Sequence, residues 1–348
     1  MYAISERLKN YMLRGSVPGL TLVLFAILFL LTSGEVLDLY VQSVLMFIGI
    51  NIILSVSLNI VNGYMGEFSC GHAGFMAVGA YVSSVLSVWL FTDDKIFGPA
   101  VFSGVSVIAL FPVIILAGGV AAAIAGLLVA FPSFRTRDDY LAIITIAANY
   151  IITSTIINIE AIGGSRGFMG MKSTIFAMED VAFLPYMVMW IFTFTVLTIF
   201  IVRRFMSSTY GKGITALKQD EVAAEIMSVN TNKMKLIAFM LSSGLAGVAG
   251  GLFAHVLGYV NPGSFSILKS TEVLIMVYMA GMGTISGSVM SAIIFTLLLE
   301  LLRPLQIIKW VLLPLLLILL MQFRPEGLMG DRELSDVFPK LKKWYRFK

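Results

Sequence analysis

Cysteine and histidine are almost absent from this chain of 348 residues. Cys70 is the single cysteine, which excludes an internal disulfide and any metal cluster held by cysteines. The two histidines, His72 and His255, are too few to build a zinc or haem site on imidazole alone. We therefore expect this chain to bind neither a metal nor a cofactor.

Charge is also scarce. Asp, Glu, Lys and Arg make up 13% of the residues, well below the share in soluble domains, whereas 58% are hydrophobic. A surface this apolar needs lipid around it, and no polar stretch is long enough to form a separate soluble domain. The net charge of +4 is explained by the basic loops of a membrane protein, so no nucleic-acid partner is expected.

Motifs for nucleotide hydrolysis and for hydrolytic catalysis are missing as well. No G-x-x-x-x-G-K-[ST], H-E-x-x-H or G-x-S-x-G run occurs. If ATP drives this protein, another chain must bind the ATP and Mg²⁺ and hydrolyse the nucleotide. We therefore do not expect the chain to be an enzyme by itself.

Apolar runs long enough to cross about 30 Å of hydrocarbon mark the expected membrane spans. The run 268–302 exceeds a single span and is interrupted by Gly281 and Gly283, so we divide it into a short crossing at 270–282 and a full helix at 285–302. The other expected spans are 17–32, 36–61, 68–91, 100–131, 140–158, 183–202, 236–257 and 310–323. The sequence thus predicts an all-α polytopic membrane protein with about ten transmembrane helices, some of them short or broken.

The first of these spans follows Arg7, Lys9 and Arg14, as the apolar part of a signal peptide would. No small-x-small cleavage site comes after it, so we expect an uncleaved first helix.

The positions of Lys and Arg predict the orientation. With the N-terminus inside, 18 of the 24 basic residues fall on the cytoplasmic side, in 1–16, around 135–137, in the loop 203–235 and in the tail 324–348. Cytoplasmic segments of inner-membrane proteins carry such an excess. We expect a cytoplasmic N-terminal segment 1–16, a transmembrane domain 17–323 and a basic cytoplasmic tail 324–348.

Small residues recur four positions apart in two spans. One run is Gly118-xxx-Ala122-xxx-Gly126 and the other contains Gly247-xxx-Gly251. Lipid provides no hydrophobic drive for helix association, so close backbone approach through small residues matters. We expect tight helix contacts at both places.

Glycine-rich polar runs interrupt the apolar pattern. The run 62–75 is either part of a solute path or an ordinary cytoplasmic turn, because irregular backbone at membrane depth needs protein or water around it. The run 162–170 could bind an anionic group through Arg166 and main-chain N–H groups, or form an exposed turn. The break at Gly281 and Gly283 could equally line a path or kink a helix for packing.

A candidate translocation path follows from the polar and glycine positions in or beside the spans. Its residues are Ser69, Gly71, His72, Asn149, Thr155, Asn158, Gly163, Gly164, Gly281 and Gly283. Few of them are charged, which suits a small solute without net charge better than phosphate or a polycation. Leucine, isoleucine and valine fit as zwitterions, and so does urea. His72 itself is better explained as a hydrogen-bonded structural residue than as a proton relay.

A short helix is expected within the loop 203–235. Asp220 is a suitable N-cap, and acidic residues occupy the first turn of the expected helix. The small central pair, Ala223 and Ala224, favours insertion into a partner protein, because a helix resting on the inner leaflet would show larger apolar residues.

Several short motifs occur in order between about residues 40 and 330. They are Gly66-Glu67-Phe68-Ser69-Cys70-Gly71-His72-Ala73-Gly74-Phe75, Gly163-Gly164-x-x-Gly167, Asp220-Glu221-x-Ala223-Ala224-Glu225, Lys235-Leu236-x-Ala238-Phe239, Ala246-Gly247-x-Ala249-Gly250-Gly251-Leu252, Gly281-x-Gly283-Thr284 and Phe323-Arg324-Pro325-Glu326-Gly327-Leu328. With this ordered set the chain resembles the permease family of branched-chain amino acid ABC importers. Two positions depart from the family, which usually has an apolar residue at Cys70 and a glycine at Ser228.

The resemblance implies a type II-like ABC importer fold in a bacterial inner membrane. It implies a second, related permease subunit, two cytoplasmic ATPase subunits that bind ATP and Mg²⁺, and a periplasmic solute-binding protein. It also implies that the helix from Asp220 to Met227 is the ATPase-coupling helix, with Asp220, Glu221, Ala223, Ala224 and Glu225 in that role.

Two other function classes remain as alternatives. A secondary transporter driven by an ion gradient would need ionisable groups buried near the membrane midplane. The candidates Glu67, Glu272, Glu300 and His255 all fall near the ends of expected spans. A membrane enzyme would need a set of acid, base and nucleophile, and the sequence offers none.

Overall fold

The structure is a computed structural model that describes residues 25–30, 32, 34, 37–92, 98–134, 140–181, 184–323, 327–330 and 333. Several predicted segments lie outside the described residues: the N-terminal segment 1–16, most of the span 17–32, the basic residues around 135–137 and those of the tail. Predictions about these parts are not tested by the structure.

Helices dominate the described chain, as the composition predicts. The helices that form the membrane domain are α2 (Leu39–Asn59, continued by the π-helix η1, Ile60–Met65), α3 (His72–Phe91), α4 (Val105–Ser133), α5 (Tyr140–Ile157), α7 (Tyr186–Met206), α10 (Thr231–Leu257), α11 (Ile267–Ala280), α12 (Ile285–Leu301) and α13 (Lys309–Phe323). Six of them, with α2 and η1 counted as one, are long and apolar enough to cross a membrane. The protein is therefore an all-α polytopic membrane protein, with a minor pair of two-residue strands, β1 (Phe168–Met169) and β2 (Tyr259–Val260).

The division of the apolar run 268–302 is confirmed. α11 ends at Ala280 and α12 begins at Ile285, and the two helices are separated by Gly281 and Gly283, whose φ angles are +98° and +91°. Only glycine adopts this backbone region readily, so the two glycines explain why the helix breaks here.

Hydropathy alone places the start of α10 five residues too late. The helix begins at Thr231, where Asn230 is the N-cap and its side chain accepts a hydrogen bond from Lys233 N at 3.0 Å. A helix can extend beyond its apolar span, and its first turns are then polar. The length of the apolar run therefore does not give the first residue of the helix.

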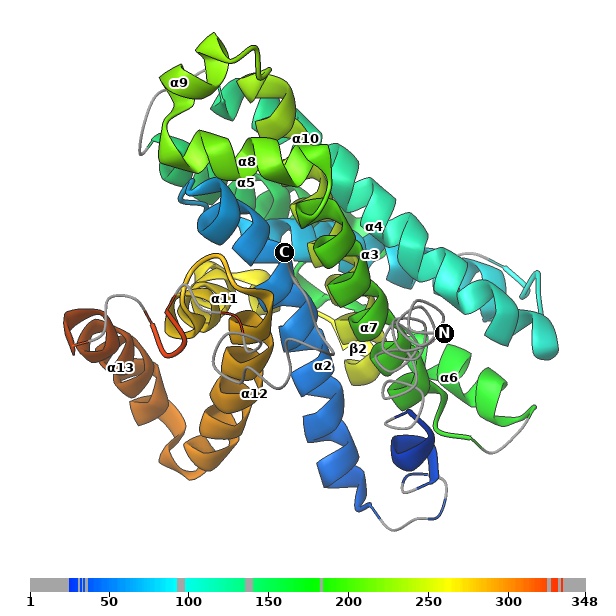
Figure 1. The fold of residues 1–348 in the computed structure, drawn as a ribbon. Coiled ribbons are helices and arrows are strands. Elements are labelled where there is room, and N and C mark those ends of the chain that lie inside the picture. Colours follow the sequence, from blue (N-terminus) through cyan, green and yellow to red (C-terminus); the bar gives the residue numbers. More distant parts are fainter. Residues whose placement is uncertain are drawn as a thin grey trace, which may run out of the picture.

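Close backbone contacts hold α3, α4 and α10 together, as the small-residue pattern predicts. Gly79 on α3 lies against Gly247 on α10, where a Cβ on Gly79 would overlap the Gly247 main chain and a Cβ on Gly247 would overlap Ala122 on α4. Gly118 on α4 packs against the Gly79 carbonyl. The three helices pack against one another in the bundle (Figure 1).

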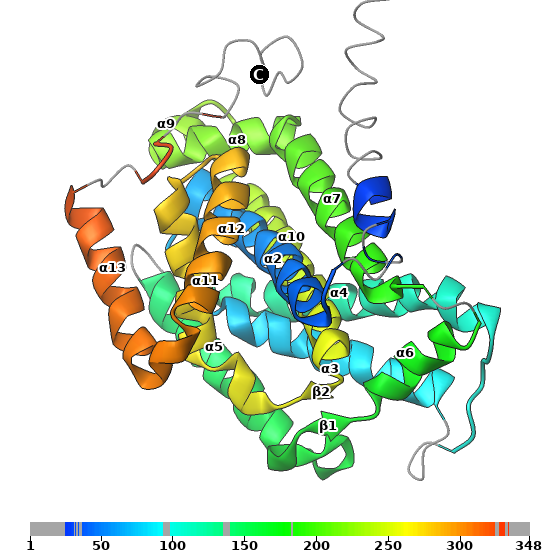
Figure 2. The same cartoon turned by 90° about the horizontal axis from the view of Figure 1, so that it is seen from below.

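Different short elements lie at the two ends of the bundle (Figure 2). One end carries α8 (Thr209–Gln219) and α9 (Glu221–Ile226). The other end carries α6 (Met171–Glu179), β1 and β2. The sequence predicts α9 but neither α6 nor α8. In α8 the signal is a Ser208 N-cap followed by buried Ile214 and Leu217, a pattern too short to identify without its tertiary contacts.

Candidate functional site

An irregular stretch of backbone joins α2 to α3 inside the bundle. The π-helix η1 ends at Met65 and is followed by Gly66, whose φ is +80°, and α3 begins only at His72. Most of this stretch is buried. Irregular backbone at this depth must find hydrogen-bond partners within the protein or in a water-filled path.

The irregular stretch lies directly against the break between α11 and α12. The Asn59 amide joins the two, because its Oδ1 accepts from Gly283 N at 3.0 Å and its Nδ2 donates to Thr284 O at 2.9 Å. Gly63 packs so close that a Cβ there would lie 2.6 Å from Gly283 N. Two departures from helical structure, more than 200 residues apart in sequence, therefore form one site.

Ser69 and His72 belong to this site. The Asn62 side chain bonds both main-chain groups of Ser69, each at 3.3 Å. His72 is buried, and its Nε2 lies 2.8 Å from Ser57 Oγ. The histidine is thus hydrogen-bonded to a structural hydroxyl, as expected.

Gly71 and Asn149 both lie where α3 faces α5, Gly71 against Thr145 and Asn149 against Gly74. Thr145 on α5 accepts a hydrogen bond from Cys70 N at 3.1 Å, and its carbonyl leaves no space for a side chain at Gly71. Asn149 is 1% exposed, and its Oδ1 has no hydrogen-bond partner among the described residues. Of the candidate path, Ser69, Gly71, His72 and Asn149 therefore gather along α3.

Four other candidate path residues do not join this group, whereas Gly281 and Gly283 lie in the break beside Asn59 and Gly63. Thr155 and Asn158 are exposed on the far part of α5, and both donate to carbonyls one turn earlier in the chain, at 2.7 and 2.8 Å. Gly163 and Gly164 lie at the end of the bundle marked by β1 and β2, where their φ angles are +88° and +50°. The translocation path through the ten residues stays a prediction, and the structure separates these four from the group along α3.

The loop helix α9 is capped as predicted. Asp220 Oδ1 accepts a hydrogen bond from Ala223 N at 3.0 Å. Beyond the helix, Ser228 adopts a left-handed conformation with φ of +63°. A glycine, which the resemblance leads one to expect at this position, would fit this conformation without strain.

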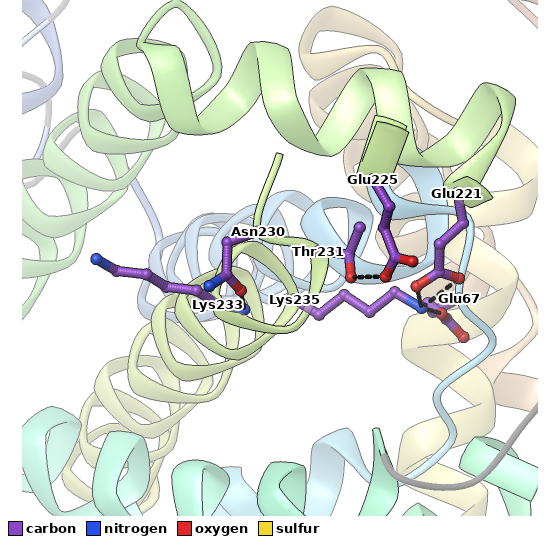
Figure 3. Close-up of polar contacts among 7 residues, drawn as sticks. All are labelled: Glu67, Glu221, Glu225, Asn230, Thr231, Lys233 and Lys235. Atoms are coloured by element: carbon purple, nitrogen blue, oxygen red, sulfur yellow. Dashed lines mark hydrogen bonds and ion pairs between the residues drawn. The ribbon is translucent and has the colours of Figure 1, made fainter. Parts of the chain in front are cut away.

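An ion-pair network ties α9 to the irregular stretch (Figure 3). Lys235, in the first turns of α10, lies 2.7 Å from Glu67 Oε1 and 2.9 Å from Glu221 Oε1. Glu225 accepts a hydrogen bond from Thr231 Oγ1 at 2.8 Å. The Lys235 side chain is 12% exposed, that of Glu67 23% and that of Glu221 47%, so the pair with Glu67 is the less solvent-screened of the two. Lys235 thus joins α9 to the segment that leads to Ser69 and His72.

The two alanines of α9 face different ways. Ala224 is 5% exposed and packs within the protein's own loop. Val222, Ile226 and Met227 are 67%, 78% and 78% exposed. The side of α9 available to a partner is thus formed by these three apolar side chains together with Ala223, and Ala224 supports it from beneath.

The acids that a secondary transporter would use are already paired. Glu272 is paired with Lys269 at 2.8 Å, and Glu300 with Arg303 at 2.9 Å. His255 is buried between Gly251 O and Ser87 Oγ. Among the described residues no group of three His, Cys, Asp or Glu side chains could hold a metal ion.

Asn59 and Glu333 belong to the site but were missed by the sequence analysis. Asn59 had a signal, since an amide within an apolar run is costly unless it has partners. Glu333 had none, because only the tertiary structure brings it to the break.

The family model described as branched-chain amino acid transport system, permease component, matches residues 40–322. The high-affinity branched-chain amino acid transport system permease protein LivM of Escherichia coli is 31% identical, over 80% of this chain and 68% of its own length. The probable LivM of Methanocaldococcus jannaschii is 21% identical over 87% of this chain and 96% of its length, and BraD of Pseudomonas aeruginosa 27% identical over 44% and 51%. No solved structure matches the chain significantly. The chain therefore belongs to the family of permease components of branched-chain amino acid transport systems.

Proposed function

We propose that this chain is the membrane subunit of an ABC importer for branched-chain amino acids and that α9 is its ATPase-coupling helix. One observation carries the proposal: α9 presents an apolar face outward and is joined through Lys235 to the buried irregular stretch. A partner that moves α9 would thereby move the segment beside the candidate path. This is the connection that an ATP-driven permease needs.

The proposed assembly contains a second permease subunit, two ATPase subunits that bind ATP and Mg²⁺, and a periplasmic solute-binding protein. The LivH protein of Escherichia coli, another permease of such a system, is 28% identical to this chain over 43% of it. This likeness supports pairing with a related chain in a type II-like arrangement. The low charge of the residues gathered along α3 supports a solute without net charge.

The solute is tested by uptake into cells that lack other routes, with the complete complex expressed. We expect uptake of leucine, isoleucine and valine that requires the ATPase subunits. Urea uptake without uptake of these amino acids would contradict the proposed solute and leave the permease assignment standing. Ion-driven uptake without the ATPases would contradict the ABC mechanism.

We also propose that both termini, α8 and α9 lie in the cytoplasm of a bacterial cell. The excess of basic residues in 203–235 and in the tail supports this orientation. Gln306, an exposed residue between α12 and α13, would then face outside. In a Cys70→Ser background, Gln306→Cys should react with an impermeant thiol reagent in intact spheroplasts. Labelling only after the cytoplasmic face is opened would overturn the orientation.

A further inference from the structure

The break between α11 and α12 leaves main-chain groups without helical partners. The carbonyls of Met279 and Ala280 lie in the last turn of α11, and the N–H groups of Ile285 and Ser286 in the first turn of α12. Thr284 is the N-cap of α12, but its side chain does not cap the helix and instead donates to Gly281 O. Such groups need hydrogen-bond partners from another part of the protein or from water.

The C-terminal segment supplies the partners of the α11 carbonyls. Leu328 N donates to Met279 O at 2.9 Å, and Met329 N to Ala280 O at 3.1 Å. Gly327, with φ of +76°, lies so close to Gly281 that a Cβ at Gly327 would overlap the Gly281 main chain. The backbone after α13 thus supplies the N–H donors that the last carbonyls of α11 lack within their own helix.

Glu333 supplies the partner of α12. Its Oε1 accepts from Ile285 N at 3.0 Å, and its Oε2 accepts from Ser286 N at 3.2 Å and from Ser286 Oγ. A carboxylate at a helix N-terminus gains from charged hydrogen bonds and from the helix dipole. We call these contacts of Gly327, Leu328, Met329 and Glu333 with the break the tail clamp.

The break is also in contact with the loop that carries α9. Asn59 binds Gly283 and Thr284, as described above, and Lys218 of α8 reaches the same place. The Lys218 side chain packs against Gly66, and a Cβ on Gly283 would lie 3.9 Å from its Nζ. Loop and tail therefore converge on one four-residue break with two glycines in a left-handed conformation.

We propose that Glu333 is a positioning residue of the transport cycle. The tail clamp holds the break in the conformation seen here, and it opens when ATP-driven movement of α8 and α9 reaches the break. Glu333 comes from a distant part of the chain, so its contacts with α12 can break without unwinding α11 or α12. Gly281 and Gly283 can take up the accompanying change in backbone angles. This inference rests on the proposed function.

Hydrogen exchange in the complete complex tests whether the clamp opens. With ATP and Mg²⁺ present, the amides of Ile285 and Ser286 should exchange roughly tenfold faster or more than without nucleotide, since each loses a hydrogen bond to a charged acceptor. Glu333→Ala should give the fast exchange without ATP and a severalfold higher ATPase rate in the absence of solute. Glu160→Ala, which removes an exposed acid at the other end of the bundle, should change neither. Protection of both amides that is the same with and without ATP would overturn the clamp, whatever the solute.

A reversible crosslink tests whether opening is required. Ser286→Cys and Glu333→Cys, combined in a Cys70→Ser chain, are joined with a short bifunctional thiol reagent that a reductant cleaves. Uptake of branched-chain amino acids by the double-cysteine chain should be lost on crosslinking and should return on reduction to its level before crosslinking. Full uptake by a completely crosslinked complex would overturn the inference. If the untreated Cys70→Ser complex takes up none of these amino acids, it is the proposed solute that fails, and the exchange experiment still decides the clamp.

Discussion

Ile226→Glu and Met227→Glu should each abolish solute-stimulated ATPase activity and uptake while the membrane domain stays folded. Both side chains are 78% exposed, so the substitutions disturb no packing within this chain. In the proposed complex the same side chains are covered by an ATPase subunit. An unpaired charge in such an interface costs several kcal/mol, enough to reduce coupling on the order of a hundredfold. ATPase and uptake assays on proteoliposomes measure the effect.

Gln219→Glu is the matched control for this prediction. It adds the same charge at an exposed position of α8, next to α9 but outside its apolar face. Its activities should stay near those of the parent. Normal coupling by Ile226→Glu and Met227→Glu would contradict the assignment of α9. Substituting Ala224 would test the idea less well, because a large side chain at this buried position would displace α9 from its own loop.

Gly250→Ala should strongly destabilise the protein, so that little of it is recovered in folded form. The Gly250 backbone lies against Met76 on α3, and a Cβ there would overlap the Met76 carbonyl and lie 3.1 Å from Ala80 N. Main-chain atoms cannot move aside as the end of a flexible side chain can, so α3 and α10 must separate. We expect a loss of about 3 kcal/mol or more, at or above the upper end of the usual range for overpacking. Size-exclusion profiles and the thermal midpoint in detergent measure it.

The same substitution at Gly263 provides the control. A Cβ on Gly263 would meet only Asn261 Oδ1, at an ordinary distance of 3.4 Å. Gly263→Ala should therefore leave both the yield and the thermal midpoint close to those of the parent. Equal stability of Gly250→Ala and Gly263→Ala would mean that the close approach of α3 and α10 is not required for the fold.

Local patterns were sufficient for several features of the molecule. Three of them depend on neighbours in sequence or on the conformational range of glycine. They are the Asp220 cap, the break at Gly281 and Gly283, and the contact face at Gly247. The grouping of the candidate path depends on more than that. Asn149 and Thr155 are both polar and on one helix, yet one is buried against α3 and the other is exposed.

The sequence by itself determined that this is a helical membrane protein, where most of its helices lie and which family it belongs to. These properties follow from apolar length, from the spacing of small residues and from ordered motifs, all of which are local. Only the tertiary structure decided that Asn59 and Glu333 meet at the break, that Lys235 joins α9 to Glu67, and that Ala224 faces inward. The physical reason is that these contacts join segments distant in sequence. A hydrogen bond or an ion pair acts only over a few ångströms, so its partner is chosen by how the helices pack and not by the order of the residues.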